Sequence, residues 1–229
     1  MAPQEDDNGN MYNFVNSGLY DALFVMEDQQ TKSLWNHFTG EAMYGPHIGD
    51  RMQVSNLMQM NVSQALVMDP TMAIAISDWE GRGDGIDRDM VNMDFDLSDP
   101  FSVTLGAEDD RRPRMEMGLG VWIDDEVYRF YPSDVLRENG RIVLDQFGDQ
   151  SLIVYLDPVI SVPVALFVDA DSASVEGADV VLDDGRIIRD SVIYDAEMNK
   201  LDVARPLQVF TRWYGFVMSF GGDRIDIFE

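Results

Sequence analysis

The sequence predicts a mainly β protein with a few helices, built as two pseudo-repeated β units that each end in a helix and a strand. Three observations support this fold class. Short apolar runs alternate with turn residues along most of the chain, few stretches have helical apolar spacing, and the order of elements in the first half returns in the second. With 229 residues and 45% apolar side chains, the chain can bury a sizeable core.

Changes in composition divide the chain into four segments. They are a polar N-terminal tail, a first β unit, an acidic Asp/Gly-rich connecting loop and a second β unit, at 1–10, 11–77, 78–114 and 115–229. The connecting loop has little periodicity apart from a short strand pattern at 101–105. We therefore expect it to run between two packed units.

Apolar periodicity places the elements of the first unit. It predicts two strands, a helix and a further strand, at 11–15, 20–26, 54–67 and 72–76. The first two strands flank a turn at residues 16–18. Ser55 is placed to cap the helix, which Asp69 and Pro70 end.

The second unit is richer in strand patterns. Strands are predicted at 118–123, 127–131, 142–146, 152–156, 162–168, 186–189, 192–194 and 224–228. A short helix follows Ser133 at 134–137, and apolar residues from Val209 to Phe220 predict the last helix.

A weak collinear echo relates the two units. Arg51-Met-Gln-Val, a helix, a turn and an apolar strand correspond to Arg205-Pro-Leu-Gln-Val and the elements that follow it. The second copy is shorter across the span that contains 35–49. The Gly/Pro loop of that span thus belongs to the first unit alone, which makes it a candidate for function.

Glycine and proline spacing predicts a tight, rigid loop at this place. Gly40, Gly45, Pro46 and Gly49 constrain the backbone. Around them lie the candidate binding residues Trp35, His37, Glu41, Tyr44 and His47. A binding loop and a buried structural corner both fit this pattern, and the structural use is the commoner one.

Charge limits the classes of partner. The formal net charge is -26, from 42 acidic against 16 basic residues. Such a surface repels phosphate backbones, so we expect no nucleic-acid binding. The acidity indicates either adaptation to high salt or a protein partner with a basic surface.

Several kinds of site are absent from the sequence. There is no cysteine, which excludes disulfides, thiolate metal sites and a cysteine nucleophile. No run has the length of a membrane span, and the polar start predicts no retained signal peptide. His37, Glu41 and His47 could form a metal site or an acid/base pair, but their segment reads as strand and loop, where four-residue spacing does not place side chains on one face. Asp94-x-Asp96-x-Ser98 lacks the glycine and glutamate of an EF-hand loop. We predict no catalytic residue, metal or cofactor.

Five residues are candidate contacts to a partner. The only basic cluster contains Arg111, Arg112 and Arg114, and the last helix carries Trp213 and Tyr214. Arginine can grip an acidic group and aromatic residues can anchor an interface. A charge-balanced loop and a core-facing aromatic stripe are the simpler interpretations.

Several motifs resemble a bacterial and archaeal family called domain of unknown function 3179. They are Thr31-x-Ser33-x-Trp35, Thr39-Gly40-Glu41-Ala42, Gly45-Pro46, Gly49, MGLGVWIDDEVYRFYPSDVL and RPLQVFTRWYGFVMSF. The resemblance covers the chain from about Tyr12 to its end. It implies a mainly β scaffold with a few helices and favours an extracytoplasmic location for a soluble or peripheral protein. Members typically carry a Cys-Pro-x-Cys-like segment, which this chain lacks, so thiol chemistry does not transfer to it.

Two functional hypotheses follow. The first is a non-enzymatic accessory or interaction protein, a soluble subunit that caps a larger, membrane-bound assembly. The alternative is a ligand-binding or enzymatic domain with its site at the loop from Trp35 to Gly49.

Overall fold

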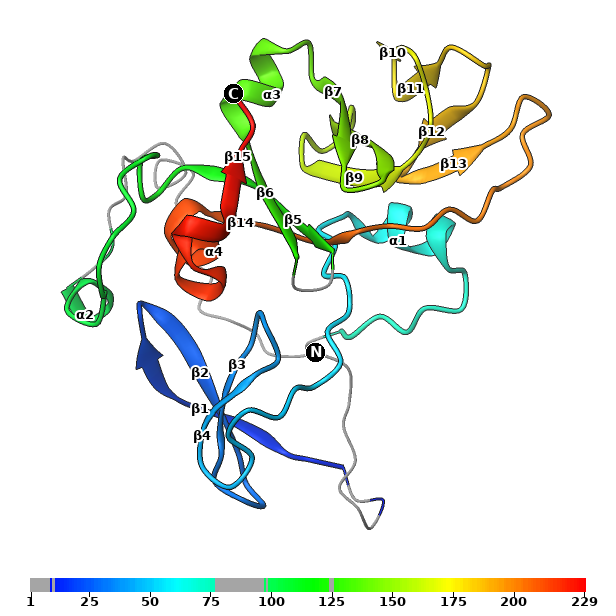
Figure 1. Ribbon diagram of the computed structural model, residues 1–229. Coiled ribbons are helices and arrows are strands. Elements are labelled where there is room, and N and C mark those ends of the chain that lie inside the picture. Colours follow the sequence, from blue (N-terminus) through cyan, green and yellow to red (C-terminus); the bar gives the residue numbers. More distant parts are fainter. Residues whose placement is uncertain (1–8, 10, 77–96, 98, 124–125) are drawn as a thin grey trace, which may run out of the picture.

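The computed structural model describes residues 9, 11–76, 97, 99–123 and 126–229. Their strands form three four-stranded sheets and one three-stranded sheet, which confirms the mainly β fold class. In Figure 1 the first sheet lies at the bottom, the sheet that pairs the C-terminal strands lies at the centre, and two further sheets lie above it. The predicted domain boundaries remain predictions, because most of the expected connecting loop lies outside the described residues.

The first sheet is an antiparallel meander in the order β1-β2-β3-β4. Its strands are β1 (Phe14–Tyr20), β2 (Leu23–Asp28), β3 (Leu34–Asn36) and β4 (Ala42–Tyr44). The turn predicted at 16–18 is wrong, because β1 passes through it with a bulge. The chain turns instead at Asp21 and Ala22, which have φ of 50° and 57°. Tertiary hydrogen bonds from Gly106 N to Asp21 Oδ1 (3.0 Å) and from Ala22 N to Thr104 Oγ1 (3.0 Å) hold this turn, and local pattern does not reveal them.

The helices of the first half differ from expectation. Helix α1 (Val62–Met68) is capped by Asn61, whose side chain accepts from Gln64 N, and not by Ser55. The residues before it run along the second half, where Asn56 Oδ1 accepts from Gln208 N at 3.0 Å. Residues 72–76 do not form a strand, and the strand predicted at 101–105 is replaced by α2 (Asp99–Ser102). Asp94 and Asp96 lie outside the described residues.

The central sheet has the order β14-β5-β6-β15. Its strands are β5 (Met117–Ile123), β6 (Val127–Pro132), β14 (Leu207–Arg212) and β15 (Ile225–Ile227). Helix α4 (Trp213–Phe220) packs on this sheet, and a 3-10 turn η2 (Gly222–Arg224) links it to β15. Val209 and Phe210 belong to β14, where they pair with β5, so the predicted last helix was too long.

Two further sheets complete the second half. They contain β7 (Ile142–Phe147), β8 (Gln150–Leu156) and β9 (Pro163–Phe167), then β10 (Ala173–Glu176), β11 (Asp179–Leu182), β12 (Ile187–Arg189) and β13 (Val192–Tyr194). Helix α3 (Ser133–Glu138) follows β6 and has no side-chain cap from Ser133. Two buried clusters lie between the central sheet and β7–β9, and between β8–β9 and β11–β13, and a third lies between the central sheet and α4.

The expected pairing of two repeated units is not confirmed. In the second half α4 is followed by β15, whereas the next element after α1 in the described residues is the helix α2. One local feature is shared, since the turns at Asp21-Ala22 and Asp190-Ser191 both have positive φ at two successive residues.

Candidate functional site

A buried carboxylate organises the hairpin that precedes the Gly/Pro loop. Asp28 is fully buried and accepts hydrogen bonds from Trp35 Nε1 (2.9 Å), Ser33 N (3.2 Å) and Thr31 Oγ1 (2.7 Å). Burial acts to raise the pKa of Asp28, but these hydrogen bonds outweigh it and lower the pKa below its usual range. Trp35 therefore has a structural role here.

His47 is held against the same hairpin. Its backbone N–H donates to Ser33 Oγ (3.2 Å), and its ring packs against the Trp35 ring with centroids 5.7 Å apart. The two ring nitrogens lie 2.8 Å from Asp50 Oδ2 and 2.9 Å from the Tyr12 hydroxyl. The loop is thus a tight, internally bonded corner, as its glycine spacing predicts.

His37 lies apart from His47. Its Nδ1 is 2.8 Å from Phe24 O, and its ring packs on Phe38 with centroids 4.3 Å apart. Burial lowers the pKa of His37, and the contact with Phe24 O offsets this only in part. His37 and Tyr214 line a small hollow beside α4, and burial raises the pKa of Tyr214.

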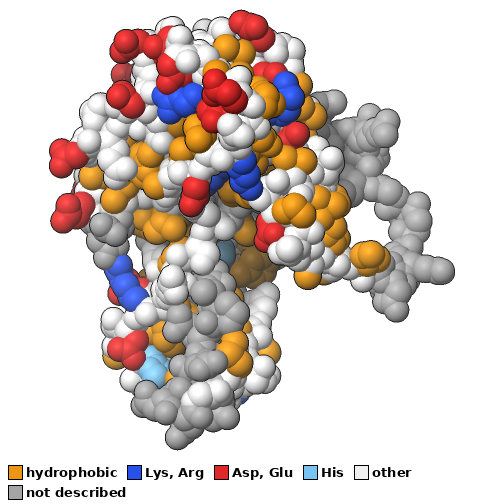
Figure 2. Space-filling view, turned by 90° about the vertical axis from the view of Figure 1, so that its right-hand side faces the viewer, with side chains coloured by type: hydrophobic (Ala, Val, Ile, Leu, Met, Phe, Trp, Pro, Cys, Tyr) orange, Lys and Arg blue, Asp and Glu red, His pale blue; other side chains and the backbone are white. Residues whose placement is uncertain are grey.

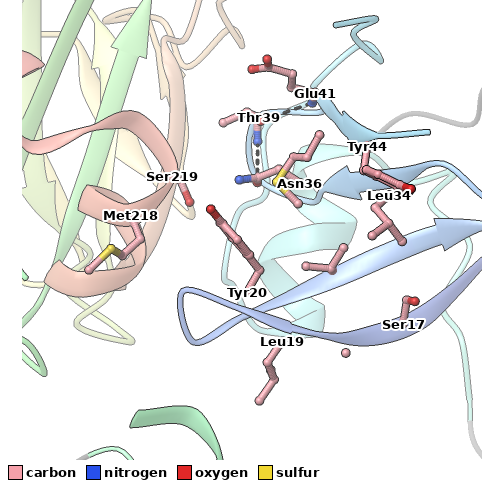
Figure 3. A pocket seen from close by; sticks show the side chains of 13 residues that line it. Ser17, Leu19, Tyr20, Leu34, Asn36, Thr39, Glu41, Tyr44, Met218 and Ser219 are labelled. Carbon is pink, nitrogen blue, oxygen red and sulfur yellow. Dashed lines mark hydrogen bonds between the residues drawn. The ribbon is translucent and has the colours of Figure 1, made fainter. Parts of the chain in front are cut away.

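Glu41 and Tyr44 line a different space, a groove between the first sheet and α4. We define the groove by Ser17–Tyr20 of β1, Leu34 and Asn36 of β3, Met43 and Tyr44 of β4, and Met218 and Ser219 of α4, with Val25, Thr39 and Glu41 completing its lining. Its volume is about 640 Å³. Figure 3 shows Tyr20 reaching from β1 toward Ser219 on α4, with Asn36 facing the same gap. The five predicted loop residues therefore do not converge, and only two of them reach this groove.

The arginine cluster makes contacts within the chain. Arg111 pairs with Asp109 (2.7 Å), donates to Gly222 O (2.6 Å) and lies over the Trp213 ring. Arg112 pairs with Glu116, and Arg114 lies 3.2 Å from Glu108. Trp213 is fully buried and donates to Asp109 O at 2.9 Å. These contacts fasten α4 and the C-terminal strand to the segment 109–116, so the arginines are engaged within the chain.

Comparison with known protein families identifies the family to which this chain is related. Residues 6–215 match the model of a family described as protein of unknown function (DUF3179). The chain belongs to the DUF3179 family. No curated protein and no solved structure matches it.

In this DUF3179 chain the Thr31-x-Ser33-x-Trp35 motif has a clear physical role, because all three residues donate to Asp28. Sequence reasoning missed Asp28 itself. An aspartate three residues before a threonine, at the end of a strand, is a signal for such a turn. Among the described residues, no group of three His, Asp or Glu side chains is placed to hold a metal ion.

A second surface feature involves helix α1 and the residues on either side of it. Seven large apolar side chains between 57 and 76 are exposed, and we call them the apolar strip: Leu57, Val62, Leu66, Val67, Met72, Ile74 and Ile76. The face that carries α1 is turned toward the viewer in Figure 2, with acidic side chains over the upper part of that view. None of the helices in the described part of the chain has the length and apolar content to cross a bilayer.

Proposed function

We propose that this protein is a non-enzymatic accessory subunit that binds a larger protein assembly through the apolar strip. The observation that carries the proposal is the orientation of α1, which is the reverse of an ordinary surface helix. Such helices bury an apolar face and expose a polar one.

In α1 the buried residue is Gln64, whereas Val62 is 55% exposed and Leu66 and Val67 are each 38% exposed. Gln64 Nε2 donates to Oδ2 of the buried Asp157 at 3.0 Å. Lys200 Nζ donates to Met68 O at the end of the helix, at 2.5 Å. Polar contacts thus fix the helix to the body of the protein, while Val62 and, in part, Leu66 and Val67 remain exposed to solvent.

The segment after α1 extends this exposure. Met72 and Ile74 are 40% and 42% exposed, and Ile76 is 90% exposed. Between 57 and 76 the only charged residue is Asp69, in a chain where 25% of residues are charged. Larger exposed apolar patches on soluble proteins mark interaction sites, and this stretch with its single charged residue suits the centre of an interface.

The negative charge of the rest of the chain indicates the charge that a partner would carry around the centre of the interface. With a net charge of -26, this surface is complementary to a partner that is apolar where it meets the strip and basic around it. Such a partner would approach faster at low ionic strength and be bound with the correct orientation. On the family resemblance we place the assembly at the outer side of a membrane.

Native mass spectrometry of gently solubilised material from the source organism tests the proposal. Tagged wild-type protein should be recovered in a defined complex. The double variant Leu66→Asp/Ile76→Asp should lower its occupancy at least about tenfold, because it places two charges in a desolvated contact. Val103→Asp is the matched control, since Val103 is 78% exposed and lies outside the strip.

Recovery of the wild type as a free monomer at matched salt would contradict the proposal. So would equal occupancy for the double variant and the Val103→Asp control, with both shown to be folded by circular dichroism. A third result, stability that rises steeply with molar salt and no complex at any salt, would favour a free salt-adapted protein.

A ligand-binding role near the Gly/Pro loop is the second candidate. It is favoured by one observation, that Glu41 and Tyr44 line the groove against α4. If Glu41→Ala and His37→Ala leave the assembly intact but abolish a bound ligand or an activity, this second function replaces the first.

A further inference from the structure

We propose that the groove between the first sheet and α4 binds a neutral carbohydrate, with Tyr20, Asn36 and Ser219 as its polar contacts. This binding site is separate from the apolar strip and does not depend on the accessory role. The inference comes from the charge, the hydrogen-bonding capacity and the shape of the groove.

The charge of the lining excludes anionic ligands. Among the described residues that line the groove there is no lysine, arginine or histidine. Glu41 is the acidic residue in the described lining, and its carboxylate lies 3.4 Å from Arg51 Nη2. A phosphate or carboxylate ligand would require a cationic partner, so a neutral ligand fits this lining better.

The polar atoms that remain can both donate and accept hydrogen bonds. Asn36 Oδ1 already accepts from Phe38 N (2.8 Å) and Thr39 N (3.2 Å), which leaves Nδ2 to donate. Ser219 Oγ donates to Gly215 O (2.8 Å), which leaves its lone pairs to accept. In Figure 3 the Tyr20 hydroxyl and the Asn36 nitrogen both point toward the gap that faces Ser219. Sugar hydroxyls combine the same two capacities.

Apolar side chains of the groove can pack on the apolar face of a sugar ring. Tyr20 and Tyr44 are 62% and 68% exposed, and Leu34, Met43 and Met218 line the space between them. A pyranose ring has an apolar C–H face that packs on such surfaces while its hydroxyls reach polar groups at the edge. A volume of about 640 Å³ is in the range of small-ligand sites and has room for a short oligosaccharide.

A cationic ligand is the main competitor, because tyrosines and a carboxylate can bind quaternary ammonium groups. Against it, the Glu41 carboxylate is shared with Arg51, and the two tyrosines come from different strands, β1 and β4. The groove is therefore better suited to a ring with hydroxyls than to a compact cation.

Saturation-transfer NMR and calorimetry on the full chain test this inference. The probes are maltotriose, cellotriose, mannotriose and N-acetylchitotriose, with tetramethylammonium as the competing class. At least one trisaccharide should bind, with a dissociation constant in the micromolar to millimolar range. Tyr20→Ala and Asn36→Asp should each weaken that binding at least about fivefold, since Asn36→Asp keeps the structural acceptor but replaces the donating amide nitrogen by a charged carboxylate oxygen that can only accept.

Tyr194→Ala on β13 is the matched control and should leave saccharide binding unchanged. Leu66→Asp/Ile76→Asp should also leave it unchanged, which separates this site from the proposed partner surface. The inference is overturned if none of the four trisaccharides binds at about 10 mM, a concentration at which a site with a millimolar dissociation constant would be mostly occupied. It is equally overturned if tetramethylammonium binds in their place, or if the groove variants bind like the wild type.

Discussion

The carboxylate of Asp28 accepts a hydrogen bond from the indole nitrogen of Trp35 at 2.9 Å, and both side chains are buried. This contact joins the end of β2 to β3 across the turn and places the Trp35 ring where His47 packs on it. Thr31 and Ser33 donate to the same carboxylate. A single buried aspartate therefore connects the family's tryptophan motif to the loop that follows.

The first prediction concerns Asp28→Asn. Neutralising Asp28 replaces a charged acceptor of several hydrogen bonds by an amide that must also donate, and should lower the free energy of unfolding by about 2–4 kcal/mol. Because the pKa of Asp28 is lowered in the folded state, its stabilisation is full above the unfolded pKa near 4 and is lost as pH falls through the folded value. Urea unfolding followed by tryptophan fluorescence at pH 7 and at pH 3 measures both effects.

The stability difference between wild type and Asp28→Asn should thus be smaller at pH 3 than at pH 7. Asp202→Asn, at an exposed position, is the control and should change stability by less than about 0.5 kcal/mol. An Asp28→Asn protein as stable as the wild type at pH 7 would contradict the structural role of this carboxylate.

The second prediction compares two glycines of the same loop. A Cβ on Gly45, where φ is +99°, would come within 2.7 Å of the Ser33 backbone, whereas a Cβ on Gly49, where φ is +87°, would meet nothing within 4 Å. Gly49→Ala should therefore cost only the strain of positive φ, about 1 kcal/mol. Gly45→Ala should cost at least about 2 kcal/mol more, because the hairpin must move. Thermal unfolding of both variants compares their stability. Equal losses of stability would contradict the close packing of Gly45 against Ser33.

The strands that sequence patterns predicted well are those whose two faces are both packed. Residues 152–156 and 118–123 read as uninterrupted apolar runs, and they become β8 and β5 at the centre of the buried clusters. Very short strands were harder to predict. Residues 173–176 and 179–182 span four residues each, too few to show a clear alternation, yet they pair with each other as β10 and β11.

Turns that depend on distant contacts could not be predicted locally. Asn16-Ser17-Gly18 has strong turn composition but forms a bulge, because Thr104 and Gly106 hold the chain at Asp21-Ala22 instead. The same limit applies to the site. The loop's glycine constraints and the burial of Trp35 follow from residue type, whereas the groove requires α4, more than 170 residues away in the chain, to lie against β1 and β3.

The last prediction tests how α1 is held. Gln64→Leu preserves side-chain volume and helix propensity but removes the hydrogen bond to Asp157, leaving that oxygen buried without this donor, and also the bond that Gln64 Oε1 accepts from Asn61 N. It should lower the free energy of unfolding by about 1–3 kcal/mol, with faster amide exchange in α1 than in β8.

Asn61→Ala, which removes the capping box, should cost about 1 kcal/mol and loosen only the first turn of the helix. Hydrogen exchange read by mass spectrometry separates the two variants. A Gln64→Leu protein that is more stable than the wild type would mean that α1 can bury an apolar face on its own body, and the outward orientation of Val62 and Leu66 would then no longer indicate a partner.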